Sequence, residues 1–374
     1  MDVKYKTIVA TLTEEILGGK FVPLGVFPSE RALAMRFAVS RQTVQRVLRE
    51  LNRRGLIYSR QGKGTFLTNS AENLRETVGL IVTGGRRTEI VSEIRDEVTR
   101  LARRMGLSLA FGDASSLNAV DAAKRAMEFA RDFVRRRVSG VILQPVEFHR
   151  DAQRVNAGIF GQFSAAGIPV VLIDCDIVEP PDRSGLDIVG IDNFSAGRQI
   201  GMHLMERRAR NVVFLAQANY PSTIRLRMEG LVSVDVRFGN AKTLVLRDLS
   251  VAELVRAFRR LEGVDAVVCQ NDVAAINLLA ALRNLGRRVP EDVLVAGFDD
   301  VTYAPLLHPS LTTVRQPCRQ IAGRAFDLLL ERVGKVESPA EDVRMMPTLV
   351  VRASTGATRA VKKVVRTSRR SVGK

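Results

Sequence analysis

The feature that most constrains the fold of this chain is an alternation of short apolar runs and longer amphipathic stretches across residues 77–356. The apolar runs are typical of buried parallel strands, and they cover residues 78–82, 138–143, 170–173, 212–216, 266–269 and 293–296. Helical patterns lie between them, around residues 91–105, 119–137, 160–166, 195–207, 251–261, 273–285 and 318–331. This alternation predicts an α/β body with helices on both faces of its sheets.

Polar residues follow the apolar runs, where α/β sheets place ligands. They include Thr83, Arg86, Arg87, Gln144, Asp174, Asp176, Asp192, Gln217, Gln270, Asn271, Asp272, Asp299 and Asp300. Carboxylates accept hydrogen bonds from hydroxyl groups and arginine donates in a fixed fork, so the set suits a ligand with many hydroxyls. Any one aspartate after a strand is more often a helix cap, and only the joint occurrence indicates a pocket.

Residues 1–68 follow a different pattern, with three short helical segments and two short strand-like pieces. Ser29 and Ser40 are suited to cap the second and third helices. The glycine-tipped turn over residues 60–64 joins the two strand-like pieces into a basic hairpin. The sequence therefore predicts a winged helix-turn-helix whose third helix enters a major groove of DNA.

The expected DNA contacts are polar residues of the second and third helices and of the hairpin tip. They are Arg31, Ser40, Arg41, Gln42, Thr43, Gln45, Arg46, Arg49, Gln61, Gly62 and Lys63. Arginine can bond guanine through two hydrogen bonds, and glutamine can do the same for adenine. A solvated helix face is the alternative interpretation, and the combination of helices and wing weighs against it.

The distribution of charge agrees with a polyanionic partner. Residues 1–68 hold 12 Lys/Arg against 5 Asp/Glu, and residues 357–374 hold 7 Lys/Arg and no acidic residue, within a net charge of +17. The tail is expected to be disordered, either adding salt-dependent DNA affinity or having no role. The polar residues 69–76 are expected to be a linker, so that head and body are coupled by geometry rather than by a large interface.

The head resembles the GntR-type DNA-binding domain over nearly all of residues 4–67. The resemblance is carried by Pro28-Ser29-Glu30-Arg31, Val39-Ser40-Arg41-x-Thr43-Val44 and Gln61-Gly62-x-Gly64-Thr65-Phe66. It implies that Arg31 and Arg41 contact DNA and that the tip reaches the minor groove. Gln45 stands where that family often has a second arginine, so the preferred base there is open.

Residues 77–356 resemble the LacI/GalR effector domain, which is related to periplasmic sugar-binding proteins. Matching stretches include Ile168-Pro169-Val170-Val171-Leu172-Ile173-Asp174, Val189-x-x-Asp192-Asn193-x-x-Ala196-Gly197, Arg227-x-x-Gly230, Asn271-Asp272-x-Ala274, Gly297-Phe298-Asp299-Asp300 and Leu311-Thr312-Thr313-Val314-x-Gln316-Pro317. The resemblance implies a two-lobed body with an effector pocket lined by Asp174, Asp192, Arg227, Asn271, Asp299 and Gln316. It also implies that the chain crosses between the lobes near residues 144–174 and again after Asp299.

This chain departs from that family in lacking tryptophan, so that stacking on a sugar ring would fall to Phe148, Phe194 or Tyr220. Thr83 and Gln144 complete the expected effector pocket. A homodimer on a two-fold operator is expected, because one short recognition helix reads few base pairs. A nucleobase or nucleoside effector, or an activating role, stays open as an alternative.

Other classes of protein fit the sequence less well. The acidic, amphipathic start is not a signal peptide, and no apolar run reaches the length of a membrane span, so a cytoplasmic protein is expected. The three cysteines and three histidines show no metal-ligand spacing, and no cofactor is expected. A transport receptor or an enzyme on an α/β scaffold is the alternative, and no catalytic set supports the enzyme.

Overall fold

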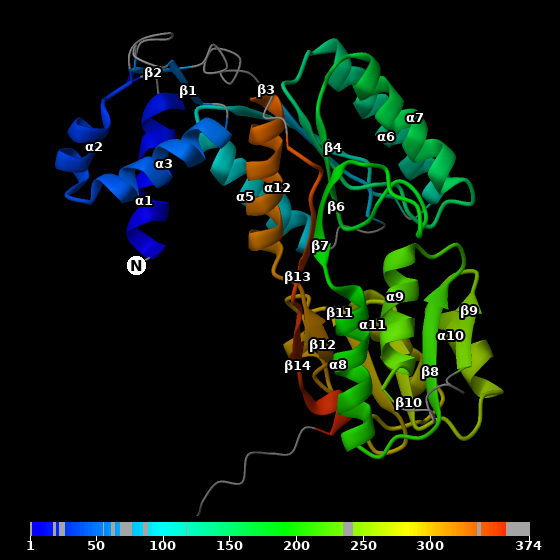
Figure 1. Cartoon of the computed structure of the whole chain (residues 1–374). Helices are drawn as coiled ribbons and strands as arrows, with labels where there is room; N and C mark the ends of the chain where they lie inside the picture. Colours follow the sequence, from blue (N-terminus) through cyan, green and yellow to red (C-terminus); the bar gives the residue numbers. More distant parts are fainter. Residues whose placement is uncertain are drawn as a thin grey trace, which may run out of the picture.

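The computed structural model describes residues 2–17, 20–21, 27–54, 56–60, 64–67, 77–84, 89–116, 118–234, 242–334 and 338–356. The expected linker, the basic tail and the wing tip at Gln61, Gly62 and Lys63 lie outside these residues. The described chain forms a small N-terminal head and a two-lobed body (Figure 1).

The head is a winged helix-turn-helix, as predicted. It contains α1 (Asp2–Leu17), α2 (Glu30–Phe37), α3 (Arg41–Arg53) and the antiparallel strands β1 (Ile57–Arg60) and β2 (Gly64–Leu67). The Ser29 and Ser40 hydroxyls each accept a backbone N–H bond at 3.2 Å, from Ala32 and Thr43, and so cap α2 and α3. Apolar residues of the three helices are buried against one another in the small core of the head.

Lobe 1 is built on an all-parallel sheet in the order β13-β7-β6-β5-β3-β4. Its strands are β3 (Thr77–Val82), β4 (Ser108–Asp113), β5 (Val141–Leu143), β6 (Val170–Ile173), β7 (Asp187–Ile191) and β13 (Asp342–Met345). Helices α6 (Ala119–Arg135) and α7 (Ala152–Ala165) cover one face, and α5 (Glu89–Arg104) and α12 (Cys318–Val333) cover the other (Figure 1).

Lobe 2 has a second six-stranded sheet in the order β14-β12-β11-β10-β8-β9, with only β14 antiparallel to its neighbour. Its strands are β8 (Val212–Gln217), β9 (Lys242–Leu246), β10 (Ala266–Cys269), β11 (Leu294–Asp299), β12 (Thr312–Arg315) and β14 (Thr348–Val350). The helices are α8 (Asn193–Glu206), α9 (Ser222–Val232), α10 (Val251–Arg259) and α11 (Asp272–Asn284), with short 3-10 turns at Ala304–Leu306 and Ala353–Thr355.

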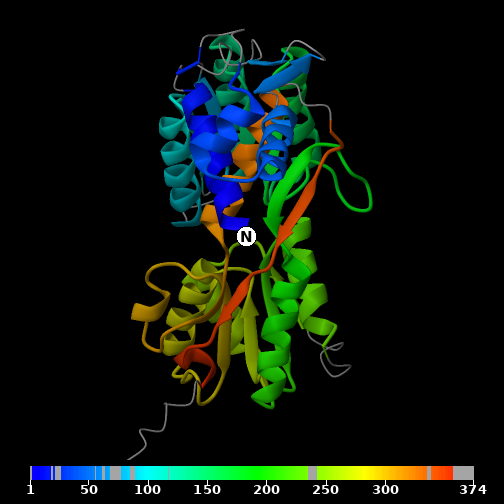
Figure 2. The same cartoon turned by 60° about the vertical axis from the view of Figure 1, so that its left-hand side comes forward.

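Three segments connect the lobes, and they correct the predicted crossings. The chain passes from β7 to α8, from β12 to α12, and from β13 to β14, the last as one extended strand path (Figure 2). The crossing expected near residues 144–174 is wrong, because β5 and β6 pair side by side within lobe 1. The crossing expected after Asp299 occurs after Arg315, once β12 has completed the second sheet.

The head lies against lobe 1 beside α5 and α12 (Figures 1 and 2). Arg53 of α3 donates two hydrogen bonds of 2.9 Å to the Glu331 carboxylate of α12, and Glu331 is 1% exposed. Arg104 of α5 also pairs with Glu14 of α1. Direct ion pairs therefore hold the head against lobe 1 in addition to the chain connection. The sequence did not predict these pairs, because their partners lie far apart along the chain.

The closest backbone approach in lobe 2 is between α8 and α9. A Cβ atom on Gly230 would lie 1.9 Å from the Phe194 carbonyl oxygen, and one on Gly197 would lie 1.8 Å from the Arg227 carbonyl oxygen. Two glycines on facing helices therefore allow the backbones to touch, and the contact includes the backbone of Arg227 in the middle of α9.

We expect Gly230→Ala to lower the free energy of unfolding by about 1–3 kcal/mol or more, because the added methyl group overlaps backbone atoms that cannot rotate away. Gly161→Ala is the matched control, since Gly161 lies in α7 with no atom within 4 Å of its virtual Cβ. That control should raise the same quantity by about 0.5–1 kcal/mol. Urea denaturation measures both, and equal stability of Gly230→Ala and the parent protein would refute the packing argument.

Candidate ligand pocket and nucleic-acid interface

A pocket between the lobes brings together most of the predicted effector residues. It encloses about 100 Å³ and is lined by Gln144, Asp174, Arg227, Asn271, Asp299 and Gln316, among others. Thr83 lines an adjoining interlobe pocket of about 390 Å³. The two pockets share Glu147, Phe148, Gln270 and Asn271 as walls. We call the smaller pocket the inner compartment and the larger pocket the outer compartment.

Arg227 is the cation of the inner compartment. Its Nε donates to the Asn193 side chain at 2.8 Å, and its Nη1 donates to the Gln270 carbonyl at 2.8 Å. The guanidinium lies 4.7 Å from the centre of the Phe298 ring, and the residue is 5% exposed. These neutral partners fix its orientation without neutralising its charge, which leaves the guanidinium able to attract the carboxylates of the pocket and a polar ligand.

Three carboxyl groups line the same compartment. Burial raises the pKa of Glu147 to about 8, with a further contribution from the nearby negative charge of Asp174. Burial likewise raises the pKa of Asp299 to about 6, against the opposing effect of Arg227, and raises the pKa of Asp174. Carboxyls held partly protonated near neutral pH can donate as well as accept hydrogen bonds, which suits hydroxyl groups that do both.

The amide side chains are partly engaged within the protein. The Gln144 Oε1 accepts from the backbone N–H groups of Thr83 and Gly84 at 3.2 Å, which ties the end of β3 to the end of β5. The Asn271 Oδ1 accepts from Ala274 N and caps α11. The Gln316 Nε2 donates to Asp299 at 2.8 Å. Because each amide also has a second polar atom, these residues can hold their elements and still face a ligand.

Asp192 departs from the expected set. Its carboxylate accepts from the Ser195 backbone N–H at 2.8 Å and from the Ser195 hydroxyl at 2.6 Å, as the N-cap of α8. It lines neither compartment among the described residues. The same is true of Asp272, which is fully buried and accepts from the Thr313 hydroxyl at 2.6 Å and the Val301 N–H at 3.1 Å.

Glu147 is the pocket residue that sequence reasoning missed. It lies four residues after the end of β5, behind Gln144, Pro145 and Val146, and no pattern in the sequence singled it out. The structure marks the place through its neighbour Phe148, whose φ of 57° lies in a backbone region that bulky residues rarely adopt.

Backbone strain also marks two of the predicted carboxylates. Asp174 has a φ of 76° and directly follows β6, and Asp299 has a φ of 117° and is the last residue of β11. Their conformations turn the chain sharply at the strand ends, in the region where the lobes face each other.

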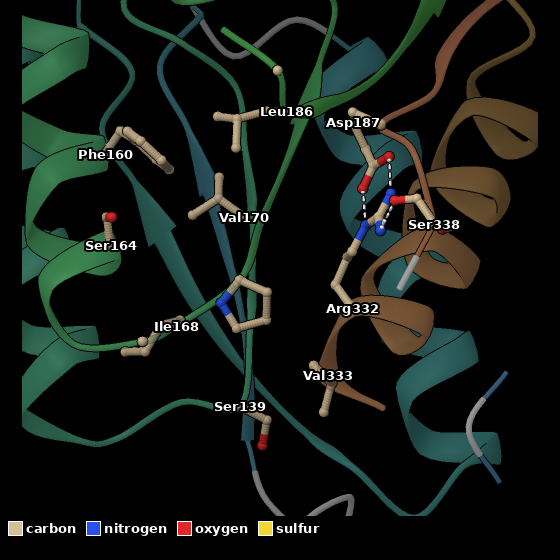
Figure 3. Close-up of a pocket in the computed structure, with 14 residues that line it drawn as sticks. Ser139, Phe160, Ser164, Ile168, Val170, Leu186, Asp187, Arg332, Val333 and Ser338 are labelled. Atoms are coloured by element: carbon tan, nitrogen blue, oxygen red, sulfur yellow. Dashed lines mark hydrogen bonds and ion pairs between the residues drawn. The ribbon is translucent and has the colours of Figure 1, made fainter. Parts of the chain in front are cut away.

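A further pocket of about 570 Å³ lies within lobe 1, between α7 and α12 (Figure 3). Its wall contains the ion pair of Asp187 and Arg332, with hydrogen bonds of 2.6 and 2.8 Å. Asp187 also accepts from the Glu341 N–H, so its carboxylate is satisfied within the protein. None of the predicted effector residues lines this pocket, and the chemistry of ligand recognition is concentrated between the lobes.

The predicted DNA-binding residues that the structure describes lie on the outer face of the head. Arg31, Ser40, Arg41, Gln42, Gln45, Arg46 and Arg49 are exposed, and Thr43 is half-buried. Glu30, which the sequence prediction did not include, accepts from Arg41 Nε at 2.7 Å and from Gln45 Nε2 at 3.3 Å. It therefore orients two side chains at the start of α3. Arg46 is stacked on the Tyr5 ring, with 4.4 Å to the ring centre.

Comparison with known families matches the head and part of the body to two different families. Residues 4–67 match the family of bacterial regulatory proteins called gntR, and residues 202–355 match the periplasmic binding protein-like domain. The fold and the two sites define a transcription regulator in which a GntR-type DNA-binding head is joined to a periplasmic-binding-protein-like body. Among the described residues, no helix is both long and apolar enough to cross a membrane.

Similar proteins include the arabinose metabolism transcriptional repressor of Geobacillus stearothermophilus, which is 28% identical over 94% of this chain and 97% of its own length. The transcriptional repressor PurR of Pasteurella multocida is 25% identical over 75% of this chain and 82% of its own. A periplasmic binding protein/LacI transcriptional regulator of Alkaliphilus metalliredigens, solved with D-xylulofuranose, shares the fold of the body. It has a TM-score of 0.62 and 22% identity and covers 75% of this chain and 99% of the other.

The raised carboxyl pKa values predict how stability depends on pH. The folded protein holds protons on Glu147 and Asp299 that the unfolded chain releases, so the free energy of unfolding should fall as the pH rises from about 5 to about 8. Glu147→Gln should flatten this fall, because its side chain does not titrate. Urea denaturation at pH 5 and pH 8 measures the difference. Glu128→Gln, at an exposed position of α6, is the control, and an identical slope in all three proteins would contradict the assignment.

Proposed function

We propose that this protein is a cytoplasmic, ligand-switched repressor that acts by binding rather than by catalysis. In this proposal residues 1–68 bind operator DNA and residues 77–356 bind a sugar or similar small polar effector. The observation that carries it is the interlobe pocket, where Arg227, three carboxyls and several amides converge from both lobes. The similarity to an arabinose metabolism repressor and to a regulator solved with D-xylulofuranose supports the sugar class.

On the DNA side, the proposal assigns base contacts to the start of α3. Arg41 has an 80% exposed side chain, and Gln42, Gln45 and Arg49 are exposed with it along the helix. One helix of this length reads few base pairs, so two copies of the chain on a two-fold operator are proposed. The wing tip at residues 61–63 and the basic tail would add contacts to the backbone of the DNA.

The connection between the two sites is proposed to run through α12. This helix begins two residues after Gln316, and Gln316 and Ile321 both line the inner compartment. Its other end carries Glu331, which pairs with Arg53 of α3. A ligand that draws Gln316 and Asp299 together with lobe 1 would displace α12, and the displacement would reach the head through the ion pair of Arg53 and the buried Glu331.

The whole proposal is tested by two measurements on the full chain. Binding sites are first selected from a random library of DNA duplexes, and a thermal-shift screen then covers neutral sugars, sugar phosphates and nucleosides. We expect a two-fold operator to be recovered, a sugar to raise the melting temperature, and the same sugar to change operator affinity. A nucleoside with these effects would shift the effector class, and no hit in either measurement would refute the function.

For the head, we expect Arg41→Ala to weaken binding to the selected operator by about 1–3 kcal/mol, because a side chain at a base edge is removed. Binding to unrelated duplexes should change much less. Fluorescence anisotropy with labelled duplexes measures both affinities. Arg256→Ala, which removes an exposed arginine of α10 in lobe 2, is the matched control. Equal losses on operator and unrelated DNA would mean that Arg41 contacts only phosphates.

For the coupling, we expect Arg53→Met and Glu331→Gln to reduce the effect of effector on operator affinity while effector affinity is retained. An allosteric effector typically changes the affinity for a second ligand about 5–150-fold, and loss of the ion pair should bring this factor in operator affinity toward one. Arg53→Met changes no residue of the body, so it still tests the ion pair if Glu331→Gln does not fold. Unaltered coupling in both variants would exclude the α12 connection.

A further inference from the structure

We propose that the effector is a two-unit polyhydroxy molecule of the disaccharide class, with one unit in the inner compartment and the second in the outer compartment. The inference rests on the proposed function, because it names the ligand of the same pocket. It differs from the expectation for a single small sugar, which would need only the inner compartment.

The first support is volume. Pockets for small molecules usually enclose about 300–1,000 Å³. The inner compartment alone encloses about 100 Å³, whereas the adjoining outer compartment encloses about 390 Å³. Because Glu147, Phe148, Gln270 and Asn271 belong to the walls of both, the compartments are neighbours in one cleft. Another pocket of about 500 Å³ also adjoins the inner compartment at Glu147, Phe148 and Pro221, but charged residues dominate its polar lining, including Arg150, Asp151, Arg154, Asp176 and Glu179. The outer compartment is therefore the neighbouring space that better suits an uncharged second unit.

The second support is the position of Phe148. This residue lines both compartments, is half-buried, and is held with a φ of 57°. Left-handed backbone at a bulky residue costs free energy and is maintained where the surrounding structure requires it. As a lining residue of both compartments, Phe148 offers an apolar surface for the C–H groups of a sugar where the two compartments adjoin.

The third support is the polar lining of the outer compartment. Lobe 2 contributes Gln217 at the end of β8, Asp248 and Ser250 before α10, and Asn277 on α11. Asn277 donates to the Leu249 carbonyl at 2.9 Å, which leaves its Oδ1 as an acceptor. The Gln217 side chain has no hydrogen-bond partner among the described residues, since only its backbone N–H is engaged, with Gln270.

The two compartments also differ in charge. Arg227, Glu147, Asp174 and Asp299 give the inner compartment its charged groups, whereas Glu147 and the exposed Asp248 are the only charged lining residues among those described in the outer one. Amides and hydroxyls that surround an uncharged space recognise hydroxyl groups through donors and acceptors rather than through charge. A neutral polyhydroxy group therefore suits the second unit, and the described lining residues of the outer compartment include no cation that would attract a phosphate.

The test compares matched pairs of sugars on the full chain by isothermal titration calorimetry, using arabinose and arabinobiose, xylose and xylobiose, and glucose and cellobiose. We expect at least one disaccharide to bind about tenfold or more tightly than its monosaccharide, an increase that two or three added hydrogen bonds can supply. Gln217→Ala and Asn277→Ala should remove that advantage and leave the monosaccharide affinity unchanged. Asn284→Ala, at an exposed position of the same helix as Asn277, should change neither affinity.

The outcomes separate this inference from the function on which it rests. A monosaccharide that binds as tightly as its disaccharide, with no effect of Gln217→Ala, would overturn the two-unit ligand and leave the sugar-responsive repressor intact. Equal losses for both sugars in the Gln217 and Asn277 variants would mean that a single ring occupies the outer compartment, which also overturns it. If no sugar of either size bound, the two-unit sugar and the sugar class of the proposed effector would both fail, whereas operator binding by the head would be unaffected. The Gln217 variant removes no internal side-chain bond, so it remains informative if Asn277→Ala does not fold.

Discussion

The buried guanidinium of Arg227 is the interaction on which the interlobe pocket depends. It reaches its place only because Gly197 and Gly230 let α8 and α9 touch backbone to backbone. There it bonds Asn193 of α8 and the carbonyl of Gln270 after β10, so one side chain joins three parts of lobe 2. A buried charge without an ionic partner is costly, and the carboxyls of the same pocket provide its compensation. Burial raises the pKa values of these carboxyls and the charge of Arg227 opposes that rise, so the guanidinium favours their ionised forms.

Helix α12 connects the interlobe pocket to the head. It lies in lobe 1, yet it follows directly from β12 of lobe 2, so its first turn is at a connection between the lobes. Its last turns carry the buried Glu331, which Arg53 reaches from the DNA-binding helix. A rigid helix with the pocket at one end and an ion pair to the head at the other transmits displacement better than a flexible linker does, because packed interfaces favour discrete arrangements over gradual deformation.

Periodicity and motifs were enough to predict the head, the alternating strands and helices of the body, and most of the pocket. They predicted six central strands correctly because these are buried on both faces and therefore continuously apolar. The edge strands β4, β9, β13 and β14 were missed because their exposed residues break that pattern. The interior strands β7 and β12 were also missed, although they are largely buried, because Asp187 begins β7 and two threonines begin β12. Asp192 and Glu147 could not be assigned for a different reason. Whether a carboxylate caps a helix or faces a ligand depends on side-chain direction, which spacing alone does not determine.

The position of the two compartments bears on how a ligand could switch this protein. A ligand shifts an equilibrium between open and closed lobes only by the difference in its affinity for the two states. Gln144 and Asp174 come from lobe 1, whereas Arg227 and Asn271 come from lobe 2, so a unit in the inner compartment contacts both. The outer compartment is likewise walled by α6 of lobe 1 and α11 of lobe 2. Each added unit that bridges the lobes therefore increases the preference for the closed state, and a two-unit ligand would couple to the head more strongly than a single ring could.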